Sequence, residues 1–143
     1  KRGAYVHLYG VGLLASLLAL KRGYGREIAE MAEIAGMLHD LLTHVDREAD
    51  TYDHAHKCAD YAKTMVLDHL CGFSEEEKMQ MYRGIYNHSD KYEKGFWFDE
   101  LIKDADAGWC GEKCADFSRL SLRRTVSFHA NYRICNTDAH FRC

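Results

Sequence analysis

Apolar side chains recur every three or four residues along most of this chain, which is the spacing of one face of an α-helix. In the first such segment Val11, Leu14, Ala15 and Leu18 share a face. Five segments carry the pattern, and we expect each to form a helix: residues 4–22, 26–43, 54–71, 74–88 and 96–106. The short links between them predict an all-α fold, a compact bundle of about five helices.

Glycine and a capping sequence mark the predicted helix ends. Gly23 follows the first helix, where glycine readily adopts the left-handed conformation of a helix stop. Ser74 and Glu77 have the spacing of a capping box at the start of the fourth helix. The polar stretches 44–53 and 89–95 are expected to be loops.

The helical pattern stops after Asp106, and no internal repeat is present. We therefore expect a helical domain over residues 1–109 and an irregular, Cys-rich, poorly ordered tail over residues 110–143. A natural extension and a shift in reading frame would both produce this change. A structural zinc site is a further alternative for the tail, whose candidate ligands are Cys110, Cys114, Cys135, His140 and Cys143.

Composition and charge exclude several classes of function. The chain has 143 residues, the size of one domain, and a net charge of -3, so we expect no strong nucleic-acid binding. The apolar run 11–20 is too short to span a bilayer and lacks a signal-peptide cleavage site. Cys58 and Cys71 fall in helical segments as free thiols, which favours a cytoplasmic protein. Because the first helix begins almost at Lys1, we expect that a preceding segment was removed.

Several polar side chains lie on inward faces or at the ends of the predicted helices. His39 and Asp40 come directly after the apolar positions of the second helix. Burying an imidazole and a carboxylate costs free energy unless a partner binds them, and a divalent cation accepts both. Hydrogen-bonded core histidines, helix-terminal histidines and solvated aspartates are the structural alternatives. The candidate ligands are His7, His39, Asp40, His54, His88 and Asp106.

The order of these residues resembles the HD-domain superfamily of metal-dependent phosphohydrolases. The matching segments are 6–11 around His7, 37–40 around His39-Asp40, and 103–106 ending in Asp106. Segments 54–59 and 85–89 look like the extra histidines of some branches. The resemblance covers about residues 1–109 and lies in the ensemble of motifs, since no single motif is specific.

The resemblance implies an HD-type bundle that binds one or two divalent ions, with Mn, Fe, Co, Ni, Zn or Mg as candidates. It implies a first metal on His7, His39, Asp40 and Asp106, with Asp40 also the catalytic residue. A second metal would use His54 and His88, with Asp40 as the bridge. Asp104 competes with Asp106 as the ligand or acts as an acceptor behind it.

The implied activity is hydrolysis of a phosphate ester, often in a nucleotide, by water activated at the metal. Lys91 is a candidate for holding the substrate phosphate, with a solvated loop lysine as the alternative. A non-catalytic metal- or nucleotide-binding regulatory module and a di-iron oxygenase stay open as other functions. A homodimer is also open, because an exposed apolar patch beside the tail would favour it.

Overall fold

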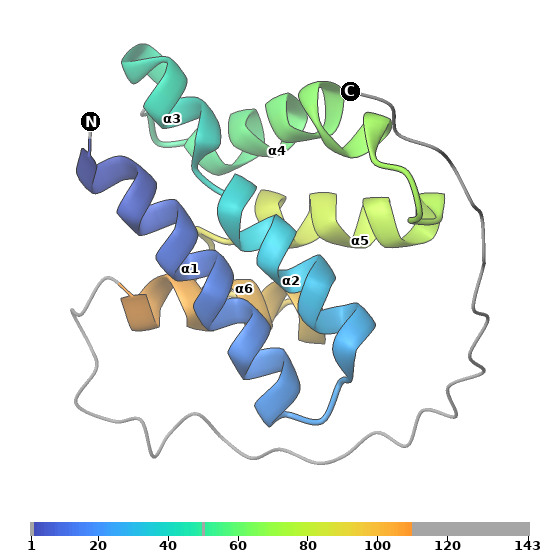
Figure 1. The fold of residues 1–143 in the computed structure, drawn as a ribbon. Coiled ribbons are helices and arrows are strands. Elements are labelled where there is room, and N and C mark those ends of the chain that lie inside the picture. The colour runs from blue at the N-terminus through green and yellow to red at the C-terminus, as the bar shows by residue number, and fades with distance from the viewer. Residues whose placement is uncertain (1, 50, 110–143) are drawn as a thin grey trace.

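All regular elements in the described part of the chain are helical (Figure 1). The structure is a computed structural model that describes residues 2–49 and 51–109. Five longer helices and one short helix, α3, make up the bundle, together with two single turns of 3-10 helix. The elements are α1 (Arg2–Lys21), α2 (Arg26–Leu38), α3 (Leu41–Val45), η1 (Arg47–Ala49), α4 (His54–Met65), η2 (Leu67–His69), α5 (Glu75–Tyr86) and α6 (Trp97–Trp109). The expected all-α bundle is confirmed.

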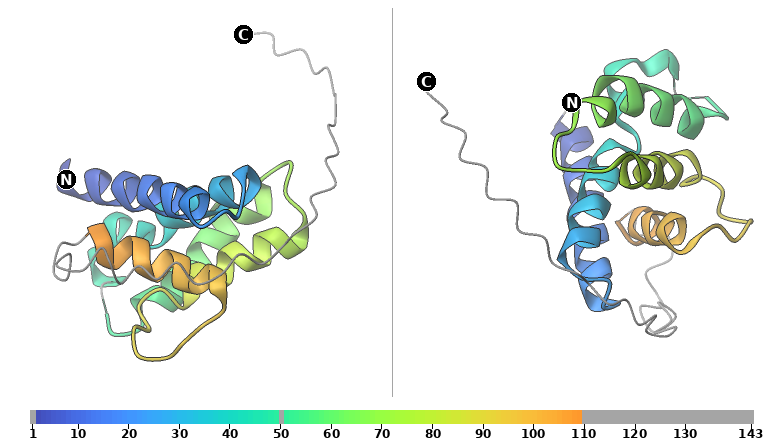
Figure 2. Two further views of the ribbon diagram at one scale, coloured as in Figure 1. Left: turned by 90° about the horizontal axis from the view of Figure 1, so that it is seen from below. Right: turned by 90° about the vertical axis from the view of Figure 1, so that its right-hand side faces the viewer.

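The helices form two layers. α1 and α2 lie side by side in one layer, and α4, α5 and α6 stack in the other, as the end-on view of Figure 2 shows. α1 packs against α6, and α2 packs against α5. The predicted apolar faces fill the space between the layers, where Val11, Met31, Ile85 and Leu101 are fully buried. Burial of these faces is what drives association of the layers.

The close approach of α1 and α2 depends on two glycines. A Cβ atom built on Gly36 would lie 2.8 Å from Cα of Gly12, well inside van der Waals contact. The two helix backbones therefore touch directly at this crossing. His7 lies one turn before Gly12 on α1, and His39 follows Gly36 by three residues. The glycine contact thus sets the distance between these two histidines.

Gly36→Ala is expected to destabilise the protein, although alanine is normally the better helix former. The added methyl group meets backbone atoms that cannot rotate away, so α1 has to shift from α2. We expect a loss of about 2 kcal/mol in the free energy of unfolding, measured by urea denaturation. Thr64→Ala, an exposed change on α4, is the control. A Gly36→Ala variant as stable as that control would contradict the contact.

The structure corrects several predicted element boundaries. The helix expected over 26–43 ends at Leu38, and a turn at His39 and Asp40 separates it from α3. The helix expected over 54–71 ends at Met65, since Val66 leaves the helical conformation and the next turn buries Leu67. The loop expected over 44–53 begins later, because α3 reaches Val45, and it contains η1. Burial of particular side chains overrides the helical period at these boundaries.

Other predictions have mixed outcomes. The capping box at Ser74 is confirmed: its side chain accepts from the Glu77 backbone N–H, and the Glu77 carboxylate accepts in return. Cys58 is buried as expected, but Cys71 is exposed beyond η2 and does not pack as a core residue. No helix among the described residues is long and apolar enough to cross a bilayer. The tail, 110–143, with its candidate zinc ligands, lies outside the described residues.

Candidate metal centre

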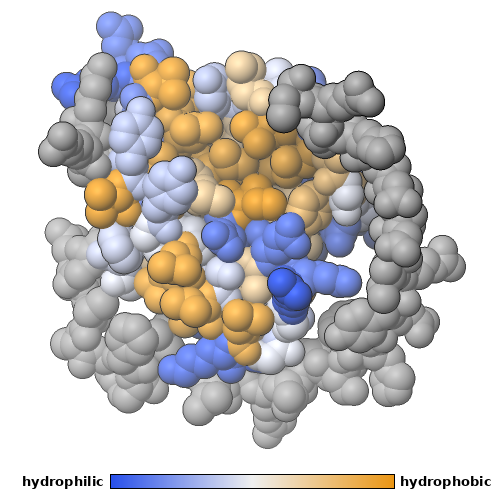
Figure 3. Space-filling view, viewed as in Figure 1, coloured by the Kyte–Doolittle hydropathy of each residue, from blue (hydrophilic) through white to orange (hydrophobic). Residues whose placement is uncertain are grey.

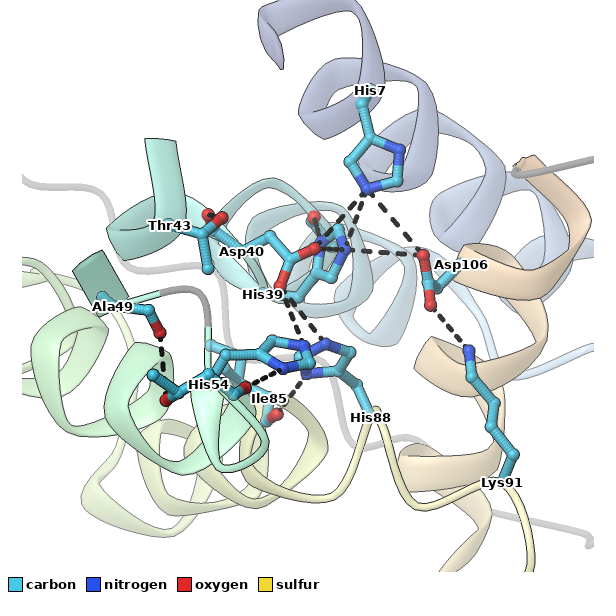
Figure 4. Close-up of polar contacts among 12 residues, drawn as sticks. His7, His39, Asp40, Thr43, Ala49, His54, Ile85, His88, Lys91 and Asp106 are labelled. Carbon is cyan, nitrogen blue, oxygen red and sulfur yellow. Dashed lines mark hydrogen bonds and ion pairs between the residues drawn. The ribbon is translucent and has the colours of Figure 1, made fainter. Parts of the chain in front are cut away.

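Six polar side chains from five helices and their ends meet at one point of the bundle (Figure 4). His7 comes from the first half of α1, and Asp106 from the last turn of α6. The turn between α2 and α3 supplies His39 and Asp40. His54 is the first residue of α4, and His88 lies just after α5. All six candidate ligands from the sequence are therefore brought together.

The first group joins α1, the α2 turn and α6. The Nε2 atoms of His7 and His39 lie 3.2 Å apart. Oδ1 of Asp106 lies 3.8 Å from Nε2 of His7 and 3.6 Å from Nε2 of His39. Donors bound to one first-row ion at about 2.1 Å sit roughly 3 to 4 Å apart. The spacing of this group fits one such ion.

The second group surrounds Asp40. Its Oδ2 lies 3.3 Å from Nε2 of His39. Its Oδ1 lies 3.4 Å from Nε2 of His88 and 3.6 Å from Nε2 of His54. The two carboxylate oxygens therefore face different histidines, which is the arrangement of a carboxylate that bridges two sites.

Asp40 is not satisfied by the protein alone. Its Oδ1 is buried and has no hydrogen-bond partner among the described residues. Asp40 also occupies the N-cap position of α3, where aspartate normally accepts from the helix backbone, yet its side chain makes no capping bond. A buried, unpartnered carboxylate oxygen costs free energy unless a cation or proton meets it. The residues present thus fit a bound cation.

Backbone carbonyls fix the orientation of three histidine rings. Nδ1–H of His39 donates to the carbonyl of Gly36 at 2.6 Å, and Nδ1–H of His88 donates to that of Ile85 at 2.7 Å. Nδ1–H of His54 donates to the carbonyl of Thr51 at 3.1 Å. A carbonyl only accepts, so the proton must be on Nδ1. In its neutral form, each of these rings presents the lone pair of Nε2 to the centre, as a metal ligand does.

Charge within the centre shifts the pKa values of three groups. Burial by itself lowers the pKa of His39, but the hydrogen bonds and negative charges of Asp106 and Asp40 raise it by more, to about 9. Burial raises the pKa of Asp40, while its contacts with His39, His7 and His88 hold that pKa well below its usual range. The pKa of Asp106 is also lowered, since the contacts with His39 and Lys91 outweigh burial. Without a metal, His39 is the cation of the centre.

The raised pKa of His39 predicts how stability of the metal-free protein depends on pH. A group whose pKa rises on folding stabilises the folded state fully below its unfolded value, 6.5, and loses that contribution as pH rises through about 9. We expect the melting temperature of chelator-treated protein to fall between pH 6.5 and 9. His39→Gln, which carries no titratable ring, is the comparison. An equal fall in that variant would contradict the assignment.

The structure separates the roles expected for Lys91 and Asp104. Nζ of Lys91 donates to Oδ2 of Asp106 at 2.6 Å, which places this cation beside the centre. The carboxylate of Asp104 accepts from the guanidinium of Arg22 instead, and it contacts no candidate ligand among the described residues. Two residues before Asp106 on a helix, it points about 160° away from that side chain. Asp106 is therefore the carboxylate that α6 contributes.

Buried charges on α6 hold the loop that carries His88 and Lys91. The Asp99 carboxylate, which is 2% exposed, accepts from Nδ2 of Asn87 at 3.0 Å and from the backbone N–H of Phe96 at 3.2 Å. Nζ of Lys103 donates to the carbonyl of Glu93 at 2.8 Å. Both ends of the loop are thus fixed to α6.

These loop-holding residues were not among the candidates predicted from the sequence. Asp99, Ile102, Lys103 and Asp106 recur at three- and four-residue spacing, so the inward register of α6 was a signal that could have found Asp99 and Lys103. Phe96, at the end of this loop, is 66% exposed, and the guanidinium of Arg83 lies over its ring.

Two further histidines lie near the candidate ligands without joining them. The ring of His44 stands edge-on to His7 with 6.4 Å between centroids, and His44 is exposed. The ring of His56 stacks on Tyr86 with 3.9 Å between centroids. Neither belongs to a group with metal-ligand spacing among the described residues. His56 therefore offers a natural control position.

A scan against family models, a search of curated proteins and a search of solved structures each find no match to this chain. The geometry of the centre is accordingly the basis for a functional proposal.

Proposed function

We propose that this protein is a metal-dependent phosphohydrolase that cleaves the phosphate ester of a small molecule such as a nucleotide. The observation that carries the proposal is the convergence of His7, His39, Asp40 and Asp106 around a carboxylate oxygen that has no partner among the described residues. The donors are neutral imidazoles and carboxylates, a set that suits first-row divalent ions. The same set resembles the ligands of the HD-domain superfamily.

Two metals fit the donors better than one. Asp40 presents one oxygen to His39 and the other to His54 and His88. We infer that the first ion takes His7, His39, Asp40 and Asp106, and that the second takes His54, His88 and the other oxygen of Asp40. When bound, these ions supply a water molecule acidic enough to act as the nucleophile near neutral pH and offset charge on the phosphoryl oxygens.

The chain's own residues prepare the centre for an anionic ester. The carbonyls of Gly36, Thr51 and Ile85 hold the three anchored rings, so no ligand has to reorient during turnover. Nζ of Lys91 lies against Asp106, and the lysine side chain is 41% exposed, which leaves it accessible to a phosphate oxygen. A lysine at that place favours a phosphate substrate over an uncharged one.

The test is phosphate release by the full chain, stripped with chelator and reloaded with Mn²⁺, Co²⁺, Ni²⁺, Zn²⁺ or Mg²⁺. p-Nitrophenyl phosphate and a panel of nucleoside phosphates serve as substrates. We expect turnover only with metal, and a loss of about 10³-fold or more in Asp40→Asn, which keeps the shape but removes the charge. His56→Ala is the control and keeps full activity.

Other outcomes identify the alternatives. Metal binding without release of phosphate from any substrate would overturn the enzyme and favour a regulatory metal- or nucleotide-binding module. Iron in the purified protein together with oxygen consumption would favour an oxygenase, for which the same donors are suited. Absence of metal binding would overturn every function built on this centre.

A further inference from the structure

The outer face of α1 is apolar along its length. Each position between residues 5 and 20 that is exposed on this helix carries an apolar or aromatic side chain, between 50% and 67% exposed. Figure 3, which views the molecule as in Figure 1, shows strongly hydrophobic side chains along the C-terminal half of α1 and paler aromatic ones along its N-terminal half. The residues are Tyr5, Val6, Tyr9, Leu13, Leu17 and Leu20, and we call them the α1 stripe.

The sequence of α1 departs from that of an ordinary surface helix. No charged residue stands between Arg2 and Lys21, whereas a helix with one face in water normally carries charges on that face. α5 follows the usual pattern, with Glu75 and Glu76 exposed in its first turn. Contiguous apolar patches of several hundred Å² mark interaction surfaces. The α1 stripe therefore needs a partner that is itself apolar.

We propose that the α1 stripe is the interface of a homodimer, in which α1 of one copy packs against α1 of a second copy about a two-fold axis near Leu13. Tyr5, Tyr9, Leu13 and Leu17 are spaced four residues apart and form one continuous ridge. Ridges of this kind interdigitate when two helices cross at about -50°. The ridge is long enough, about 18 Å, to cross its own copy near the middle.

Self-pairing matches the chemistry of the ridge. Aromatic residues occupy its N-terminal half and leucines its C-terminal half. A two-fold axis roughly perpendicular to α1 makes the two helices antiparallel, so tyrosines of one α1 meet leucines of the other. The hydroxyl groups of the tyrosines reach the rim of the contact, where water is available.

The size of the α1 stripe is sufficient for a stable pair. Six side chains that are half to two-thirds exposed present on the order of 100 Å² each, or about 600 Å² per copy. Complete burial of the α1 stripe in both copies would remove about 1,200 Å² of surface from water, which is the lower end of the range for specific dimers. The proposed dimer uses no contact of the candidate metal centre. A negative result for the dimer therefore leaves the proposed enzyme unaffected, and the reverse also holds.

Sedimentation velocity of the full chain over a hundredfold range of concentration tests the dimer. We expect a reversible monomer–dimer equilibrium in the wild type. Leu13→Glu and Leu13→Lys each place like charges across the axis and are expected to weaken dimerisation by about 100-fold or more. Met79→Glu, a charge placed on an exposed apolar position of α5, is the matched control and leaves the dimer intact.

Mixing the two Leu13 variants separates self-pairing from any other use of the α1 stripe. Glutamate in one copy then faces lysine in the other, and we expect the mixed pair to dimerise more tightly than either variant alone. A wild-type chain that is monomeric throughout would overturn the proposal. So would a dimer that both Leu13 variants leave unchanged, or variants whose mixture stays monomeric. Circular dichroism melts of each variant verify that it is folded.

Discussion

His39→Ala is expected to remove the ion held by His7, His39, Asp40 and Asp106 and to reduce turnover by about 10³-fold or more. His39 is fully buried, and its Nε2 lies within 3.6 Å of His7, Asp40 and Asp106. It belongs to both groups of side chains with metal-ligand spacing. The substitution therefore deletes the one histidine that both groups share. Elemental analysis of protein purified without chelator, together with phosphate release, measures both effects.

Two companion variants make the His39 result interpretable. His39→Gln preserves most of the side-chain volume in this buried position and still lacks the imidazole, so a fold defect is separated from the loss of a ligand. His56→Ala removes a histidine that stacks on Tyr86 outside the centre, and it should keep its metal. Equal metal content in the wild type and in both His39 variants would refute the assignment of the centre.

His88→Gln is expected to halve the bound metal, from two ions per chain to one, and to lower turnover by about 100-fold. Its Nε2 faces Oδ1 of Asp40, the side of the carboxylate turned away from His39. The group of His7, His39 and Asp106 does not include His88 and should retain its ion. Isothermal titration with Mn²⁺ or Co²⁺ gives the stoichiometry directly.

His54→Ala provides the matched comparison, since His54 approaches the same oxygen of Asp40 from α4. Both variants should lose the same ion, and the double variant should lose no more metal than either single one. If His88→Gln instead retains as much metal as the wild type, the centre holds one ion and His88 is a structural residue. Complete loss of metal in His88→Gln would show that the two groups do not bind independently.

The metal affinity of the centre should also depend on pH through His39. Its pKa of about 9 in the metal-free protein means that a proton occupies Nε2 at neutral pH. A metal ion needs that lone pair, so binding releases the proton. Affinity is expected to rise as pH increases toward 9. Titrations in buffers of different ionisation enthalpy count the released protons.

The sequence alone determined the helical class and the set of candidate ligands. Apolar residues at the helical period mark which face of α1 and of α6 turns inward, and His7 and Asp106 lie on or at the edge of those faces. Local chemistry also fixed the start of α5, because the capping box of Ser74 and Glu77 needs only neighbouring residues. Such features depend on the chain within a few residues and are readable without a structure.

Only the tertiary structure decided how the ligands are oriented. In a continuous helix Asp40 would stand about 100° from His39. The break after Leu38 turns its carboxylate onto the His39 ring instead. Asp104 and Asp106 are equally polar in the sequence, and the contact of Asp104 with Arg22, 82 residues away, separates them. These outcomes depend on packing between distant segments, which no local pattern of residues specifies.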